Sequence, residues 1–249
     1  MNLTGKVAIV TGGSAGLGRQ ICHTLSASGT NVAVVYNRNH DDAQTEAGEL
    51  NQSGVQSEAV RCDITDHNQV KTLVAEVMET FGRLDILINN AAYNKWVAFS
   101  DLDSLTSEVW NKIITTNLTA PMLLIKEVAE HMNREGLGRI VNIASIAGLS
   151  PRGSSIAYAV SKAGLIHLTK CMAVALAPKI LVNCIAPGYM QDTRMSSNLS
   201  PEYQKRAIDG SVLKRTTDKD DVAKQVVIFC ETESTTGQTI SIDAGRHFH

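Results

Sequence analysis

The stretch TGGSAGLGRQI (residues 11–21) joins a strand-like run, KVAIVT (6–11), to a segment with helical spacing. Its glycines are spaced G-x-x-x-G-x-G, and such glycines let the backbone turn tightly and bring amide N–H groups against a pyrophosphate at a helix N-terminus. A glycine-rich turn alone is ordinary turn chemistry. Between the strand and the helix of a βαβ unit, however, it predicts dinucleotide binding. The candidate contacts are Gly12, Ser14, Gly16, Leu17 and Gly18.

Strand-like and helical patterns alternate along the rest of the chain. Short β-branched runs lie at 6–11, 31–36, 57–62, 84–89, 138–144, 180–185 and 238–243. Segments with helical spacing lie at 17–28, 67–81, 105–132, 155–177 and 219–231. Runs that are apolar on both faces are typical of strands covered by helices on each side, and repeated alternation implies right-handed crossovers. The predicted fold is α/β, a doubly wound seven-stranded parallel sheet with helices on both faces, of the Rossmann type.

The chain has no Pro/Ser-rich linker and no shift in composition that would mark a domain boundary. We therefore predict a single dinucleotide-binding and catalytic domain over 1–249. The segment at about 189–215 is polar and fits the alternation poorly. Long irregular insertions in compact domains are usually functional lids or disordered loops, and its position after a strand's carboxyl end favours a substrate lid.

Composition excludes several classes of partner. Lys and Arg (23) nearly balance Asp and Glu (25), which argues against a nucleic-acid or anionic-membrane partner. The sequence has no long apolar run and no secretory signal pattern, so we expect a soluble, cytoplasmic protein. The cysteines have neither metal-ligand nor disulfide spacing, and we expect them to be core residues. They are Cys22, Cys62, Cys171, Cys184 and Cys230.

The second strand ends in Tyr36-Asn37-Arg38, without an acidic residue at its tip. Folds that prefer the unphosphorylated cofactor place a carboxylate there to bind the ribose 2′-hydroxyl. A carboxylate would repel a 2′-phosphate, whereas Arg38 can donate two hydrogen bonds to one. Arg38 could instead be a solvated loop residue. The sequence favours NADP(H), leaves NAD(H) possible, and makes Asn37 and Arg38 the candidate contacts.

Asp63 and Ile64 follow the third strand, in the motif CDIT. Asp63 could accept a hydrogen bond from the adenine amino group while Ile64 supplies a backbone contact. Alternatively, Asp63 could cap the next helix, although Asp66 and Thr65 are better placed for that role.

The stretch IAYAVSKAGL places Tyr158 and Lys162 one helical turn apart. A phenol ordinarily titrates at about 10, so it exchanges protons poorly at neutral pH. A lysine at i+4 lies on the same helix face, and its charge would favour the phenolate. The alternative is a Tyr/Lys pair without chemistry on a half-exposed helix.

Further motifs occur in a characteristic order. After TGGSAGLG come NNAA (89–92), TTNL (115–118), Ser145 in NIASIAG, YAVSK (158–162) and PGYMQDT (187–193). In this order and spacing they resemble the short-chain dehydrogenase/reductase family, from about residue 3 to 245. Within that family the chain most resembles 3-oxoacyl-thioester reductases and related small carbonyl reductases. The resemblance implies hydride transfer between NADPH and a carbonyl or alcohol substrate.

The resemblance also implies roles for individual residues. Tyr158 would be the acid/base, Lys162 would lower its pKa and bind the nicotinamide ribose, Ser145 would hold the substrate oxygen, and Asn117 would anchor a water. Asn90 and Ala91 would approach the adenine ribose. The nicotinamide and pyrophosphate would lie beside Pro187, Gly188 and Thr193.

The substrate is expected to be a small molecule, and loops after the strands would contact it. These contacts would be Tyr93, Asn94, Lys95, Trp96, Ala147, Pro151, Arg152, Tyr189 and Met190, together with the lid. A sugar or polyol dehydrogenase, and a non-catalytic dinucleotide-binding sensor, remain the alternatives.

We expect a homo-oligomer, a tetramer by the resemblance, because the segments 105–132 and 155–177 carry apolar residues on their outer faces. The loops within 176–184 and 229–238 are shorter than is usual in the family, which bears on assembly contacts more than on catalysis.

Overall fold

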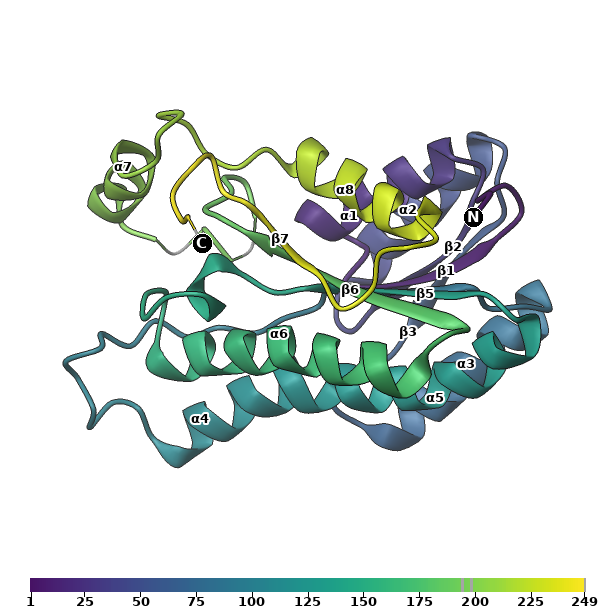
Figure 1. Cartoon of the computed structure of the whole chain (residues 1–249), viewed down its shortest axis with the longest axis horizontal. Helices are drawn as coiled ribbons and strands as arrows, with labels where there is room; N and C mark the ends of the chain where they lie inside the picture. The colour runs from purple at the N-terminus through teal and green to yellow at the C-terminus, as the bar shows by residue number, and fades with distance from the viewer. Residues whose placement is uncertain (194, 198, 249) are drawn as a thin grey trace.

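The strands of the protein form one parallel sheet (Figure 1). The computed structural model describes every residue except 194, 198 and 249. The sheet has seven strands in the order β3-β2-β1-β4-β5-β6-β7, and every neighbouring pair is parallel. The predicted Rossmann-type sheet is confirmed. The strands are β1 (Val7–Thr11), β2 (Asn31–Tyr36), β3 (Ser57–Arg61), β4 (Ile86–Asn89), β5 (Gly138–Ile143), β6 (Ile180–Pro187) and β7 (Thr239–Ile242).

Helices cover both faces of this sheet (Figure 1). One face carries α1 (Gly16–Ala27), α2 (His40–Gln52) and α8 (Lys219–Glu231). The other carries α3 (His67–Phe81), α5 (Ala120–Glu135) and α6 (Ile156–Leu176), with α4 (Ser107–Ile114) packed against α6. The remaining helix, α7 (Pro201–Asp209), lies apart from both layers, at the left of Figure 1.

The strands supply two hydrophobic cores, because successive side chains of a strand point to opposite faces. Val10 and Val34 pack into the core under α1, α2 and α8. Their neighbours Ile9 and Val35 pack into the core under α3, α5 and α6. Every residue of β1 is buried, which explains why its sequence is apolar throughout and does not alternate.

The predicted helix at 105–132 is interrupted in the structure. It divides into α4, a π-helical turn η1 (Thr115–Thr119) and α5. A π turn accommodates one extra residue in a single turn, which hardly changes the periodicity of a long segment and therefore escapes pattern analysis. Helix α2 was also absent from the predicted helices.

The segment 189–215, predicted to be irregular, contains the helix α7. Ser200 caps α7 by accepting a hydrogen bond from the Tyr203 N–H, and Pro201 occupies the first turn, where its missing N–H costs nothing. This Ser-Pro pair was a helix-start signal in the sequence. Residues 194 and 198 of the segment lie outside the described residues.

Among the described residues, α6 alone is long and apolar enough to cross a membrane by length and composition. It lies against β6 and the 3-10 turn η2 (Ile146–Gly148), and it buries Lys162 and Leu165. These contacts are those of a core helix.

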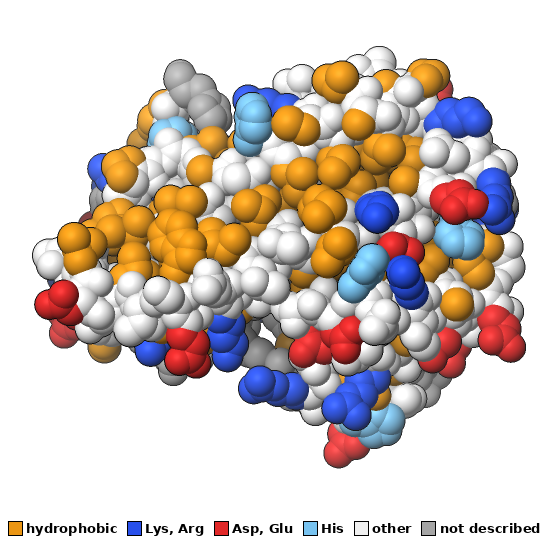
Figure 2. All heavy atoms as spheres, turned by 90° about the horizontal axis from the view of Figure 1, so that it is seen from below, with side chains coloured by type: hydrophobic (Ala, Val, Ile, Leu, Met, Phe, Trp, Pro, Cys, Tyr) orange, Lys and Arg blue, Asp and Glu red, His pale blue; other side chains and the backbone are white. Residues whose placement is uncertain are grey.

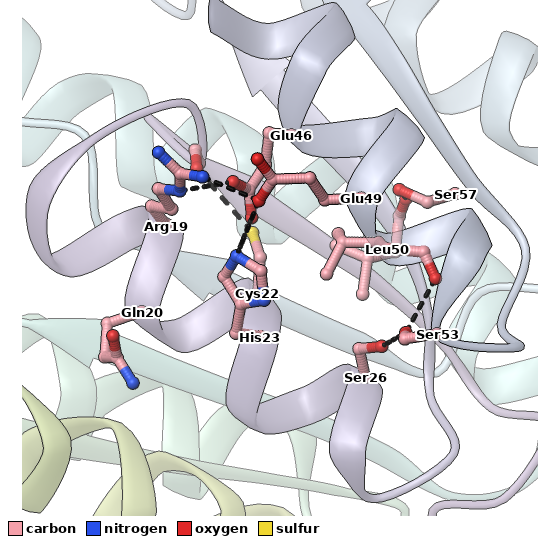
Figure 3. A network of polar contacts seen from close by, with 12 residues as sticks. Arg19, Gln20, Cys22, His23, Ser26, Glu46, Glu49, Leu50, Ser53 and Ser57 are labelled. Atoms are coloured by element: carbon pink, nitrogen blue, oxygen red, sulfur yellow. Dashed lines mark hydrogen bonds and ion pairs between the residues drawn. The ribbon is translucent and has the colours of Figure 1, made fainter.

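An ion-pair network joins α1 to α2 (Figure 3). Arg19 of α1 contacts Glu46 (Nε to Oε2, 2.7 Å) and Glu49 (Nη2 to Oε2, 2.6 Å) of α2. His23 Nε2 lies 3.3 Å from Glu46 Oε1. Burial raises the pKa of Glu46, and the neighbouring His23 and Arg19 oppose that shift. Because α1 follows the glycine turn and α2 follows β2, the network fixes the two helices that begin at the nucleotide end of the sheet.

Candidate active site

A cleft of about 1300 Å³ opens at the carboxyl ends of the strands, where the strand order reverses between β1 and β4. Every predicted catalytic or cofactor residue except Asn117 lines it. The residues that do so are Gly12, Ser14, Gly16, Leu17, Gly18, Asn37, Arg38, Asp63, Ile64, Asn90, Ala91, Ser145, Tyr158, Lys162, Pro187, Gly188 and Thr193.

The glycine turn forms one end of the cleft. Gly12 has φ +66°, and a Cβ at Gly18 would lie 2.1 Å from the Gly12 carbonyl oxygen, so neither position accepts a larger residue without strain. Helix α1 begins at Gly16 without a side-chain cap. Its first N–H groups and the helix dipole therefore suit an anion, and the turn fits the pyrophosphate of a dinucleotide.

Asn90, directly after β4, forms hydrogen bonds with the start of this turn. Its Nδ2 donates to the carbonyl oxygen of Thr11 at 2.9 Å. The Thr11 Oγ1 accepts from the backbone N–H groups of Asn90 and Ala91, each at 3.0 Å. The loops after β1 and β4 are thus held together by these bonds.

The ends of β2 and β3 form the other part of the nucleotide end. One oxygen of Asp63 accepts from Thr65 N at 3.0 Å and from Thr65 Oγ1 at 2.7 Å. These hydrogen bonds, together with the side chain of Asn37 and the charge of Arg38, lower the pKa of Asp63. Asp66, not Asp63, caps α3. Arg38 therefore lines the cleft beside the carboxylate of Asp63. The negative charge of Asp63 weakens the attraction of Arg38 for an anion but does not cancel it.

Ser145, Tyr158 and Lys162 meet at the centre of the cleft. Ser145 follows β5 and begins the turn η2, whereas Tyr158 and Lys162 lie on α6. Ser155 caps α6 by accepting from the Tyr158 N–H at 3.1 Å, which sets where the helix begins. The Lys162 side chain is 2 % exposed, and its Nζ donates to the Ile143 carbonyl oxygen at 2.8 Å.

Burial dominates the pKa values of this group. It raises the pKa of Tyr158 to about 12, against a smaller lowering by a hydrogen bond with Ser145. It lowers the pKa of Lys162 to about 8. The predicted lowering of the phenol pKa by Lys162 is therefore not found in this structure. Lys162 Nζ lies 5.8 Å from the centre of the Tyr158 ring, and burial is the largest cause of the raised pKa of the phenol.

Asn117 lies in the π-helical turn and is fully buried. Its Oδ1 accepts from Tyr93 N at 2.8 Å, and its Nδ2 donates to Tyr93 O at 2.9 Å and to Ser161 Oγ at 3.0 Å. The side chain thus connects the loop after β4 to α6, next to Lys162. Asn117 is not among the residues that line the cleft, and its role in anchoring a water stays a prediction.

On the substrate side, most predicted contacts line the cleft, but Lys95 and Pro151 do not. The lid was expected to contact the substrate, but none of its residues beyond Met190 was named as a substrate contact, because no helix was predicted in it. The cleft residues after β7 and those of α4 and η1 were not predicted. Together these cleft residues are Met195, Ser196, Leu199, Tyr203, Ala207, Arg246, His247 and Phe248, and from α4 and η1 Asn111, Lys112, Thr115 and Thr116. The Trp96 and Tyr203 rings meet edge to face at 5.1 Å between centroids.

A parallel sheet with a glycine turn at its reversal point, and a Ser-Tyr-Lys group beside that turn, defines an NAD(P)-dependent oxidoreductase. Residues 6–204 match the family described as short chain dehydrogenase, and the chain belongs to the short-chain dehydrogenase/reductase family.

Several named proteins of this family are similar over nearly the whole chain. The chain is 34 % identical over 245 residues to the 3-oxoacyl-(acyl-carrier-protein) reductase FabG of Staphylococcus epidermidis, covering 97 % of this chain and 99 % of that protein. The structure of an NADPH-dependent 3-quinuclidinone reductase from Rhodotorula rubra is similar with a TM-score of 0.89 and 25 % identity, over 98 % and 92 % of the two chains. That of a single-residue variant of the actinorhodin polyketide ketoreductase with NADPH has a TM-score of 0.89 and 30 % identity, over 97 % of each chain.

Proposed function

We propose that this chain uses NADPH to reduce the carbonyl group of a small molecule, and that Tyr158 supplies the proton. The observation that carries the proposal is that Ser145, Tyr158 and Lys162 share one cleft with the uncapped N-terminus of α1. The bound cofactor would supply a hydride to the carbonyl carbon. The products are then an alcohol and NADP⁺, and the protein must provide one proton to the oxygen.

The phenol of Tyr158 is the proton donor in this proposal. With a pKa of about 12, it is protonated at neutral pH, which suits donation to a carbonyl oxygen and therefore the reductive direction. Ser145 donates a hydrogen bond to the same oxygen and stabilises the charge that develops there. Lys162 stabilises the phenolate after transfer by its charge. Asn117 acts as a positioning residue, because its bond to Ser161 holds α6 at the base of this group.

The remaining cleft residues would hold the cofactor. The glycine turn would bind the pyrophosphate, and Arg38 and Asn37 would bind the 2′-phosphate. Lys162 would bind the nicotinamide ribose. Asp63 and Ile64 would contact the adenine, with Asn90 and Ala91 beside its ribose. The contacts of the nicotinamide half would be Pro187, Gly188 and Thr193.

On the substrate side of the cleft, here called the substrate chamber, Trp96, Met190, Tyr203 and Phe248 form apolar and aromatic walls beside polar side chains such as Asn94 and Arg152. Such walls favour a carbonyl compound with an apolar body over a polyol. Assaying NADPH absorbance with ketones, 3-oxoacyl thioesters and sugars tests the proposal. Turnover of apolar ketones or thioesters is expected. Turnover of sugars alone would contradict the proposal and indicate a polyol dehydrogenase instead.

The cofactor preference rests on Arg38. Arg38→Ala is expected to remove most of an NADPH preference of about 10- to 150-fold, because charge-assisted hydrogen bonds to a phosphate contribute roughly 1.5–3 kcal/mol. The measurement is kcat/KM with NADPH and with NADH for both proteins. Arg61→Ala is the matched control, since Arg61 is exposed at the end of the adjacent strand and lies outside the cleft lining. A wild type that prefers NADH would contradict the assignment.

We also propose that the chain acts as one catalytic domain in a cytoplasmic homotetramer. Figure 2 shows apolar side chains gathered on the face of the molecule seen from below, the side on which α4, α5 and α6 lie. The α6 residues Val160 and Val174 are 44 % and 81 % exposed. Light scattering is expected to return about four times the 26.8 kDa of one chain, and the mass of a single chain would refute the tetramer.

A further inference from the structure

The segment Asp243–Phe248 follows β7 and folds into a turn held by one carboxylate. Asp243 Oδ1 accepts from Gly245 N at 3.0 Å, and Oδ2 accepts from His247 N at 2.7 Å. Ala244 and Gly245 have φ of +57° and +73°, a left-handed conformation that is costly for alanine and needs support. The carboxylate supplies that support and directs the segment toward the lid.

The turn is attached to the lid by backbone and side-chain hydrogen bonds. Leu213 N donates to Ala244 O at 3.0 Å, and Val212 N donates to Gly245 O at 3.2 Å. Arg246 Nη1 then donates to the carbonyl oxygens of Arg206 (3.0 Å) and Ala207 (2.6 Å) in the last turn of α7. In Figure 1 the yellow end of the chain lies beside the loops that flank α7.

A cation at this place suits the end of a helix. The last carbonyl groups of a helix have no intrahelical partner and carry the negative end of the dipole. The Arg246 guanidinium binds the carbonyl oxygen of Ala207 and also that of Arg206, which already accepts from Gly210 N at 3.1 Å. An ammonium on a flexible stem is less suited to such a paired contact. Among the described residues, the other side-chain hydrogen bonds of α7 stay within 199–214. Within the described part of the chain, Arg246 therefore makes the side-chain hydrogen bonds that join α7 to a segment outside the lid.

Helix α7 covers the substrate half of the cleft. Tyr203 and Ala207 of this helix line the cleft, and the Tyr203 ring meets Trp96 from the loop after β4. Phe248, three-quarters exposed, lines the same cleft from the attached segment. A displacement of α7 would therefore open the wall that faces the substrate and leave the nucleotide end intact.

We propose that Arg246 is a positioning residue that holds α7 over the substrate chamber, so that the segment Asp243–Phe248 sets how tightly the enzyme binds bulky carbonyl substrates. The effect on substrate binding rests on the proposed function. The structural part of the proposal, the attachment of the lid, does not depend on any activity.

Arg246→Ala is expected to raise KM for an uncharged bulky ketone roughly tenfold, because the closed lid loses two charge-assisted hydrogen bonds. The Kd for NADPH should stay within about twofold, since none of the residues assigned to the cofactor lies on α7 (Pro201–Asp209). An uncharged ketone is used so that loss of a direct contact between Arg246 and an anionic substrate cannot produce the result. Arg246→Lys is expected to restore part of the wild-type KM.

A second readout follows the lid without substrate. Trypsin cleavage after Lys205, Arg206, Lys214 and Arg215, followed by mass spectrometry, is expected to be several-fold faster in Arg246→Ala than in wild type. The matched control is Arg215→Ala, an exposed lid arginine outside the cleft lining, which is scored at the other three sites and should leave both KM and their cleavage unchanged. Unchanged cleavage in Arg246→Ala overturns the attachment, and faster cleavage with unchanged KM overturns the role in substrate binding. Should the chain reduce no carbonyl, the proposed function fails while the cleavage rates still decide the attachment.

Discussion

Tyr158→Phe is expected to lower kcat by about 10²–10⁴, the usual contribution of general acid catalysis, while Kd for NADPH changes by less than about twofold. The substitution removes the phenolic hydroxyl and keeps the ring that packs with Val97, Val109 and Ala157. The proton donor is lost, whereas the glycine turn and Arg38 are untouched. Single-turnover measurement of NADPH oxidation, with cofactor binding followed separately by fluorescence, separates the two effects.

A matched hydroxyl deletion controls for general damage to the cleft. Tyr93→Phe removes a phenolic oxygen from the cleft wall, and its ring stays beneath Lys112, whose Nζ lies 4.5 Å from the ring centre. Tyr93→Phe should lower kcat far less than Tyr158→Phe does. If Tyr158→Phe kept activity within about threefold of wild type, Tyr158 would not be the proton donor.

Asp85→Ala is expected to lower the free energy of unfolding by about 3 kcal/mol, the lower end of the cost of breaking a buried ion pair. Asp85 is fully buried before β4. It accepts from Val7 N at 3.0 Å and from Arg83 through two bonds of 2.7 Å, and it pairs with Lys6 at 3.2 Å. The lower end applies because Arg83 and Lys6 are partly exposed and can regain water. Urea denaturation followed by circular dichroism measures the difference, with exposed Asp103→Ala as the control.

The same carboxylate gives the stability a defined dependence on pH. Burial tends to raise the pKa of Asp85, but the hydrogen bonds from Arg83 and Val7 and the charge of Lys6 outweigh it and lower the pKa. A lowered pKa in the folded state means that this stabilisation is present above the ordinary carboxyl pKa of about 4 and is lost as pH falls through the folded value. The difference between wild type and Asp85→Ala should therefore be constant near neutral pH and shrink below about pH 4. A difference that grew on acidification would contradict this assignment.

The elements that local sequence specifies were predicted well. β2 (Asn31–Tyr36) and α3 (His67–Phe81) have the predicted bounds, because a buried strand needs an apolar run and an amphipathic helix needs its period. The glycine turn was predicted from its glycine spacing and from its place between a strand and a helix, since its conformation depends on the absence of side chains at a few positions. Tyr158 and Lys162 were paired correctly because four residues along one continuous helix always return to the same face.

Other features depend on contacts between segments far apart in the chain. The π-helical turn has Asn117 bonded to the backbone of Tyr93, which lies on another loop, so no local pattern reveals that contact. The attachment of α7 is made by Arg246, some 40 residues away, through carbonyl groups that any residue would present. The pKa of Tyr158 rises although a lysine stands one turn away, because burial is a property of the packed structure. The spacing of residues along a helix or strand can be determined from the sequence. Desolvation and hydrogen bonds between distant segments exist only once the chain has folded.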